Sequence, residues 1–197
     1  MKLSYCIKHI WIWLCRIPHR KGYGIHSPFA FNLVTGVIYE RGAYYAYDQL
    51  KREYPTVQDE YPTKDLQLLL RLCNDARPRR GVVVAPECDA VVAYMKAGCR
   101  ECEFMHWDDA KQMNLEKMDW LYVGREADVQ KVLDQMVDKM AESAVIVMRD
   151  IYQSDQVKQA WDKMKRSERV RVTFDLYDFG LAYFEQRLNK EDYVISY

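Results

Sequence analysis

Charged residues stand directly after several apolar runs of this 197-residue chain, where a parallel sheet would gather them at one edge. Asp150 follows the apolar run at residues 144–148, and Arg125 follows the run at 118–123. In open α/β sheets ligands bind outside the carboxyl ends of the strands, so Asp150 is a candidate catalytic residue in such a crevice. The other residues expected at this edge are Glu87, Asp108, Asp109 and Tyr152. Position alone defines no mechanism, and ordinary polar loops are the alternative interpretation.

Cys99 and Cys102 have the spacing of a redox pair or of half a zinc site. A redox pair of the thioredoxin type sits at a helix N-terminus, whereas this pair follows a predicted helix and enters a predicted strand. No second cysteine pair completes a zinc site, although His106 could add a third ligand. Alternation along a strand accounts for these residues, so we predict neither a redox function nor a metal site.

His26 is the second catalytic candidate. In the structural interpretation, Ser27 caps a helix that begins at Pro28, and the His26 ring holds this helix against the rest of the chain. In the functional interpretation, His26 is a base that lines the crevice. Capping accounts for the order His-Ser-Pro and favours the structural interpretation.

The strand and helix that must position these residues are clearest at residues 81–98. Val82, Val83 and Val84 form a short β-branched run, which is typical of a strand buried on both faces. Apolar residues at helical spacing follow, and Gly98 is placed to end the helix. A buried strand that leads into a helix is the first half of a βαβ unit.

The same alternation continues to the C-terminus. Helices are expected at residues 28–39, 50–54, 64–76, 127–141 and 157–164, and strands at 102–106, 118–123, 144–148, 170–176 and 181–185. This order predicts a Rossmann-like, doubly wound α/β sheet that is mostly parallel and ends in an antiparallel hairpin. We expect a helical cap at residues 1–78 and one α/β domain at residues 79–197.

Composition and charge exclude some classes of function. The chain is 49% hydrophobic and has a formal net charge of zero. Residues before Glu40 carry five positive charges and no negative one, so the remainder is net negative, which argues against a nucleic-acid partner. Six cysteines without paired spacing, and no cleavable signal, are typical of a reducing, cytoplasmic setting.

The first sixteen residues read as a helix with a broad apolar stripe that includes Ile7, Ile10, Trp11 and Leu14. Its basic charge and aromatic residues are also typical of a helix that lies on a membrane surface. Packing on the domain, or self-association with a second subunit, is the alternative. The thin polar face favours packing.

Three motifs, in chain order, resemble a family of small bacterial class I methyltransferase-like proteins that use S-adenosylmethionine. Residues 24–31, Gly-Ile-His-Ser-Pro-Phe-Ala-Phe, are similar to the family's opening. Residues 150–151 and 160–161 resemble its Asp-Asp-Ile strand end and its Ala-Trp helix, and residues 173–176 with 180–181 are similar to its last two strands. The resemblance spans nearly the whole chain and implies a methyltransferase-type sheet with S-adenosylmethionine as cofactor.

The positions that the resemblance assigns to the cofactor depart from the family's pattern. Pro86, followed by Glu87, falls near the first glycine of the family's first loop, and proline lacks both an N–H donor and glycine's range of φ. The carboxylate that would bind the ribose is absent from the end of the second strand. Asp108 and Asp109 follow directly and could replace it. Gly124 precedes an arginine, whereas the family has aspartate before glycine.

Two further departures concern the substrate side and the length of the sheet. Arg149 replaces the first of the family's paired aspartates. Residues 107–117 are too few for the strand and helix that normally form the adenine pocket, so the sheet is expected to lack one βα unit.

Two hypotheses on function follow. In the first, the chain is a methyltransferase-like protein whose cofactor site is eroded, a non-catalytic binding or interaction module. The expected place for a small-molecule ligand is then the carboxyl edge of the sheet. In the second, it is an active S-adenosylmethionine-dependent methyltransferase with an atypical pocket. The missing glycines and the missing ribose carboxylate favour the first.

Overall fold

A computed structural model describes residues 23–55, 61–85, 89–112, 117–125 and 128–197, with the backbone alone for residues 110–112. Its elements in chain order are α2 (Pro28–Leu33), η2 (Val34–Ile38), α3 (Tyr45–Glu53), α4 (Thr63–Ala76), β1 (Arg80–Val84), α5 (Asp89–Gly98), β2 (Glu103–His106), α6 (Trp107–Gln112), β3 (Met118–Val123), α7 (Val129–Met136), η4 (Val137–Lys139), β4 (Met140–Arg149), α8 (Asp155–Arg166), β5 (Val172–Asp175), β6 (Phe179–Tyr183) and β7 (Glu191–Val194). The predicted helix at residues 1–16 lies outside the described residues.

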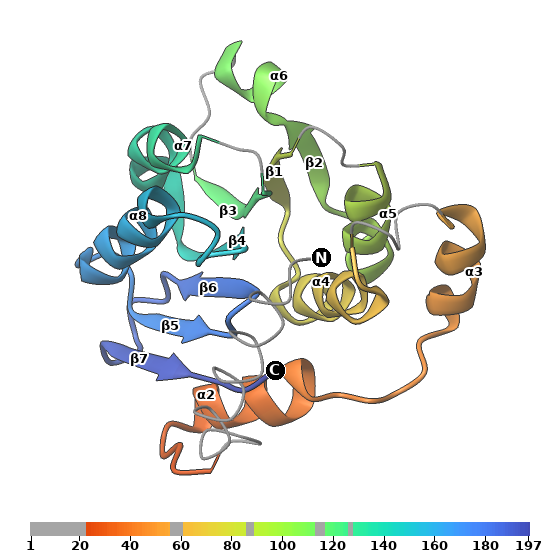
Figure 1. Cartoon of the computed structure of the whole chain (residues 1–197), viewed down its shortest axis with the longest axis horizontal. Coiled ribbons are helices and arrows are strands. Elements are labelled where there is room, and N and C mark those ends of the chain that lie inside the picture. The colour runs from red at the N-terminus through yellow and green to blue at the C-terminus, as the bar shows by residue number, and fades with distance from the viewer. Residues whose placement is uncertain (1–22, 56–60, 86–88, 113–116, 126–127) are drawn as a thin grey trace.

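The seven strands form one sheet in the order β2-β1-β3-β4-β6-β5-β7. Six strands run in the same direction and only β6 is antiparallel to its neighbours, β4 and β5. Figure 1 shows α7 and α8 on one face of this sheet and α4 and α5 on the other. The predicted α/β sheet, mostly parallel with an antiparallel pair near the C-terminus, is therefore confirmed.

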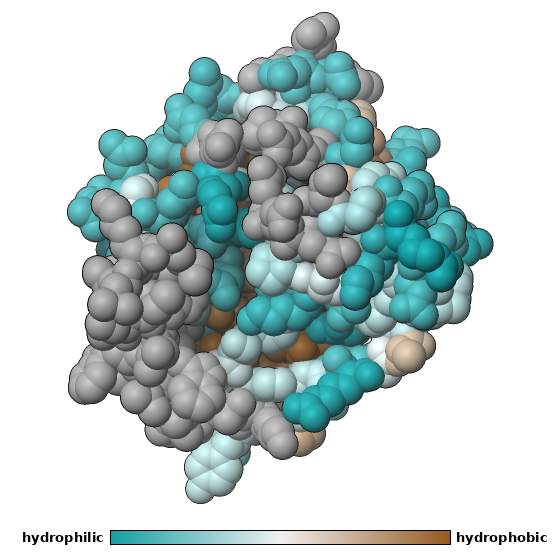
Figure 2. Space-filling view, turned by 45° about the vertical axis from the view of Figure 1, so that its right-hand side comes forward, coloured by the Kyte–Doolittle hydropathy of each residue, from teal (hydrophilic) through white to brown (hydrophobic). Residues whose placement is uncertain are grey.

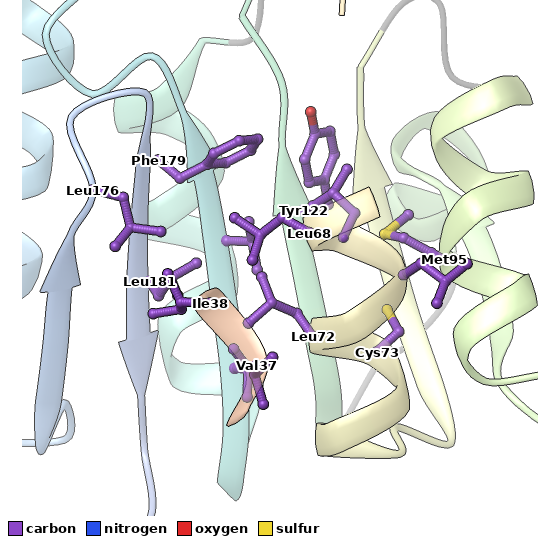
Figure 3. Close-up of a cluster of buried hydrophobic side chains, with 14 of the residues drawn as sticks. Val37, Ile38, Leu68, Leu72, Cys73, Met95, Tyr122, Leu176, Phe179 and Leu181 are labelled. Atoms are coloured by element: carbon purple, nitrogen blue, oxygen red, sulfur yellow. The ribbon is translucent and has the colours of Figure 1, made fainter. Parts of the chain in front are cut away.

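The sheet has a hydrophobic core on each face, and successive side chains along a strand belong to the two cores in alternation. In β1 and β3, Val83 and Tyr122 join the core beneath α4 and α5, whereas Val82 and Leu121 join the core beneath α7 and α8. Figure 3 shows the first core, where Leu68 and Leu72 of α4 lie in front of the sheet together with Val37 and Ile38. Figure 2 shows that the described outer surface on the side of α3 and α5 is mostly hydrophilic.

A buried arginine connects α4 to the elements before it. Arg71 is 6% exposed and donates from Nε to the Val37 carbonyl oxygen at 2.7 Å and from Nη2 to that of Ile38 at 3.3 Å. Its Nη1 donates to the Tyr47 hydroxyl at 3.2 Å. These carbonyls end η2 and have no partner further along the helix, so a cation is favourable there. Within the first core, Phe29 of α2 also packs edge-on against Tyr183, with 5.2 Å between ring centroids.

Several predicted boundaries were wrong. The helix expected at residues 127–141 ends at Lys139, and Met140 already belongs to β4, because pairing with Met118 of β3 competes with the helical apolar pattern. The helix expected at 28–39 becomes a π-helix from Val34. The edge strand β7 (Glu191–Val194) was not predicted.

The observed sheet agrees with the predicted loss of one βα unit. β2 is an edge strand, and the described residues between β2 and β3 contain α6 but no strand. The division at residue 78 stays a prediction, although α4 shares its core with the strands. No helix among the described residues is long and apolar enough to span a membrane.

Candidate functional site

A charge cluster lies at the carboxyl ends of β3 and β4. Arg125, just after β3, donates from Nε to Oδ2 of Asp150 at 2.6 Å. Nε of Arg149, the last residue of β4, lies 3.3 Å from the same oxygen. The side chains of Arg149 and Asp150 are 3% and 15% exposed, whereas that of Arg125 is 47% exposed. Asp150 therefore lies between one buried and one surface guanidinium group.

Two tyrosines enclose the buried part of this cluster. The guanidinium carbon of Arg149 lies 3.6 Å from the ring centroid of Tyr61, which is close enough for a cation–π interaction. Tyr122, on β3, is fully buried, and burial together with the neighbouring Tyr61 raises the pKa of its hydroxyl group well above the usual value. Arg149 is therefore held in place by packing as well as by charge.

Asp65, in the first turn of α4, is a buried acid beside the cluster. It is 2% exposed, and burial raises its pKa to about 6. The negative charges of Asp178 and Asp150 raise this pKa further, while Lys64 and Arg149 lower it. Its Oδ1 has no hydrogen-bond partner within the described residues. A buried acceptor of this kind is suited to a donor on a bound molecule.

Two loops form the rim of the cluster. Asp150 has φ 52° and donates its N–H to the Asp178 carbonyl oxygen at 2.7 Å. Tyr177 has φ 74°, and its ring stacks on Tyr152 with 5.3 Å between centroids. The Tyr152 hydroxyl donates to Asp175. Left-handed backbone at residues other than glycine costs about 1 kcal/mol each, and such strain is typical of functional loops.

The structure brings only some of the predicted site residues together. Asp150 meets Arg125, and Tyr152 lies on the neighbouring rim. Asp108 and Asp109 are exposed in the first turn of α6, which stands at the end of β2 (Figure 1). Pro86 and Glu87 lie outside the described residues.

The remaining candidates have structural explanations. Gly124 donates its N–H to the Val84 carbonyl oxygen at 2.7 Å, and a Cβ there would lie 2.8 Å from that of Ala85. Close strand packing thus accounts for this glycine. Ser27 caps α2 as predicted, accepting from the Ala30 N–H at 3.4 Å, while His26 is exposed just before the cap.

The cysteine pair is not suited to redox chemistry. Cys102 is 2% exposed, and burial raises its pKa to about 12. The Cys99 thiol is half-buried and donates to the Pro78 carbonyl oxygen at 3.4 Å. Because the thiolate is the reactive form, Cys102 is unreactive at neutral pH.

Sequence reasoning missed four residues of the site: Tyr61, Asp65, Tyr177 and Asp178. Tyr61 and Asp65 precede the predicted α/β domain, and no local pattern connects them with residues 85 positions later. The one available signal is an acidic residue, Asp65, on the otherwise apolar stripe of α4.

Comparison with known proteins supports the fold. No family model and no curated protein matches the chain. Among solved structures, it is similar to the O-methyltransferase TomG from Streptomyces achromogenes in complex with SAM (S-adenosylmethionine), at 12% identity, 73% and 91% coverage of the two chains and a TM-score of 0.53.

Two further structures agree. The O-methyltransferase from Bacillus cereus in complex with SAH (S-adenosylhomocysteine) is 10% identical, with 73% and 92% coverage and a TM-score of 0.50. The SAH-bound methyltransferase PaMTH1 from Podospora anserina is 8% identical, with 80% and 96% coverage and a TM-score of 0.52. The chain therefore has the Rossmann-like fold of SAM-dependent O-methyltransferases.

Proposed function

We propose that this protein is a binding module with a methyltransferase fold, which holds a small polar molecule at the carboxyl edge of its sheet and does not transfer methyl groups from SAM. The observation that carries the proposal is the ion-pair network of Arg125, Asp150 and Arg149. It places the chain's own charges at the edge where ligands of such folds bind.

The network leaves Asp150 little capacity as a catalytic base. Both neighbouring guanidinium groups contact the same carboxylate oxygen, Oδ2. A general base must reach the proton that it removes, and Oδ2 of Asp150 is already in contact with both guanidinium groups. Asp150 is better suited to holding the two arginines in place than to catalysis.

The described residues also fit SAM poorly. A carboxylate beneath the ribose would have to come from Asp108 or Asp109, yet both are exposed in α6, which follows β2 without an intervening loop.

The polar groups at this edge instead suit a ligand with both an anionic and a donor group. The guanidinium group of Arg125 is half-exposed, and Asp65 has a buried acceptor, Oδ1, beside the cluster. The rings of Tyr152 and Tyr177 stack on each other in the neighbouring loops. Few, well-placed polar groups beside aromatic side chains are typical of small-molecule sites.

An active methyltransferase is the second candidate, and one observation favours it. The pKa of Asp65, about 6, lies near neutral pH, where a carboxyl group works well as a general base. If SAM does bind, Asp65 rather than Asp150 is the residue to test for catalysis.

Isothermal titration calorimetry with SAM and with SAH separates the two candidates. We expect no saturable heat for either molecule. A micromolar dissociation constant, about −8 kcal/mol, would contradict the proposal. The Asp108→Asn/Asp109→Asn double variant then shows whether these carboxylates hold the ribose. Asp48→Asn, an exposed change in α3, is the matched control.

A further inference from the structure

A concave surface lies at the opposite end of the sheet from Asp150. It is an open hollow of about 810 Å³ where α8 ends and where β4, β5 and β7 begin. Its charged lining residues are Arg166, Arg169, Arg171, Lys190, Glu142 and Glu168. Because parallel strands begin at one edge and end at the other, this hollow is separate from the cluster around Asp150.

The charge of the hollow is unbalanced. Its four cations and two carboxylates leave a formal charge of +2 in a chain whose net charge is zero. Within the described residues neither Arg171 nor Lys190 forms an ion pair. The ion pair of Arg169 within the described residues is a long contact of 3.8 Å to Asp138, whose side chain is 91% exposed. Such an exposed pair neutralises little charge.

Backbone carbonyl groups hold these cations in fixed positions. Nε of Arg171 donates to the Leu188 carbonyl oxygen at 2.8 Å. Nζ of Lys190 donates to those of Ser167 at 2.8 Å and Val170 at 2.6 Å. Carbonyl dipoles orient a cation without cancelling its charge. The side chains are thus positioned in advance, which lowers the entropy cost of binding.

Donors of these side chains remain for a ligand. The hydrogen bond of Arg171 uses Nε, and within the described residues its two Nη groups make none. Lys190 uses two of its three N–H donors. Burial lowers the pKa of Lys190, the negative charge of Asp192 raises it, and the positive charge of Arg171 lowers it. An anion between the two side chains would relieve this repulsion.

Helix capping explains part of the arrangement but not all of it. Arg166 lies in the last turn of α8, and Lys190 binds carbonyl groups just beyond it, where cations are favourable. That effect extends over one helical turn. It gives no reason for Arg171, before β5, to stand beside Lys190 with no ion pair of its own within the described residues.

We propose that this hollow binds a small anion with several phosphate charges. The planar guanidinium group of Arg171 matches a phosphate group with two parallel N–H donors, and Lys190 adds a compact charge beside it. The volume exceeds what a single phosphate fills, so a polyphosphate chain or a phosphorylated small molecule fits best. The phosphate could belong to a soluble molecule or to a lipid headgroup.

Titration calorimetry of the full chain with inorganic tripolyphosphate tests the proposal. We expect saturable binding that weakens with added sodium chloride, because exposed charges are screened. Arg171→Gln/Lys190→Gln should weaken it at least tenfold, since two charges are lost while polar side chains remain. Glu142→Gln, which removes a carboxylate from the same wall, should strengthen it several-fold. Lys158→Gln/Lys163→Gln, on α8 outside the hollow, is the control with equal charge loss.

The outcomes separate the alternatives. Equal weakening in the α8 control and in the Arg171/Lys190 variant would show a non-specific charge effect and overturn the proposal. Absence of tripolyphosphate binding to a wild-type protein with a normal unfolding transition would also overturn it. Co-sedimentation with phosphatidylcholine vesicles that contain a phosphoinositide, lost in the Arg171/Lys190 variant, identifies a headgroup as the source. Binding of tripolyphosphate without vesicle binding identifies a soluble ligand.

Discussion

Removing Trp161 tests how α8 packs on the sheet. Trp161 is 1% exposed, as predicted from its place on the inner stripe of its helix. Loss of a buried indole in Trp161→Ala costs roughly 3–5 kcal/mol. The indole Nε1 has no hydrogen-bond partner within the described residues, so the folded wild-type protein bears the cost of burying an unpaired N–H group. Because Trp161→Ala removes this cost, we expect a loss of stability at the lower end of this range. For a chain of this size, the expected fall in Tm is roughly 6–20 °C.

Gly180 provides a matched second variant. A Cβ on this β6 residue would lie 2.7 Å from Cζ3 of Trp161 and 2.9 Å from Cγ2 of Ile151. Gly180→Ala alone should therefore destabilise the protein by about 1–3 kcal/mol through overpacking. In the Trp161→Ala background the new methyl group enters the vacated space. The double variant should be more stable than the sum of the single effects predicts, by at least about 1 kcal/mol.

Urea unfolding of the four proteins, followed by circular dichroism, measures this double-mutant cycle. Strictly additive effects would show that Gly180 does not face Trp161. An unchanged midpoint for Trp161→Ala would show that the register of α8 is wrong. Trp161→Phe serves as the control, because it keeps most of the apolar contact and removes the buried N–H group.

Three further predictions concern Arg71, Asp65 and the N-terminus. Arg71→Met should cost about 3 kcal/mol in urea unfolding, because the carbonyl groups at the end of η2 lose a charged donor; a loss below about 1 kcal/mol would contradict this. The pKa of Asp65 is raised from 3.8 to about 6, so its stabilising contribution is present below about pH 4 and disappears as the pH rises through 6. Relative to Asp65→Asn, the wild type should thus lose roughly 3 kcal/mol between pH 4 and 7.5, and parallel pH profiles would refute the assignment. Deleting residues 1–17 should cause aggregation or a new oligomeric state in sedimentation analysis, whereas a monodisperse product with loss of liposome binding would indicate a membrane-surface helix.

The parts of the fold that the sequence predicted are those with a strong local pattern. Residues 118–123 alternate between two buried faces, so their strand was predicted with its observed bounds. The edge strand β7 consists of two charged residues, Glu191 and Asp192, followed by two apolar residues, so no alternating apolar run marks it. At Met140 the local apolar pattern of a helix competed with pairing to β3, and the pairing prevailed.

The candidate site was less accessible to sequence reasoning. The position of Asp150 followed from the strand before it, since strand ends share an edge. Its pairing with two arginines, and the enclosure of Arg149 by Tyr61, depend on contacts between distant segments. The basic hollow also depends on contacts between distant segments, because Arg171 and Lys190 meet only after β5 and β7 pair side by side.

A crystal structure of the protein grown with excess SAH would show directly whether the cofactor binds. We expect that Arg125 and Arg149 still contact Asp150, that Arg149 remains against the Tyr61 ring, and that no nucleoside lies at the carboxyl ends of the strands. SAH bound across β1, β2 and β3, with Asp108 or Asp109 on its ribose, would contradict it. The protein would then be a cofactor-binding methyltransferase with an atypical pocket.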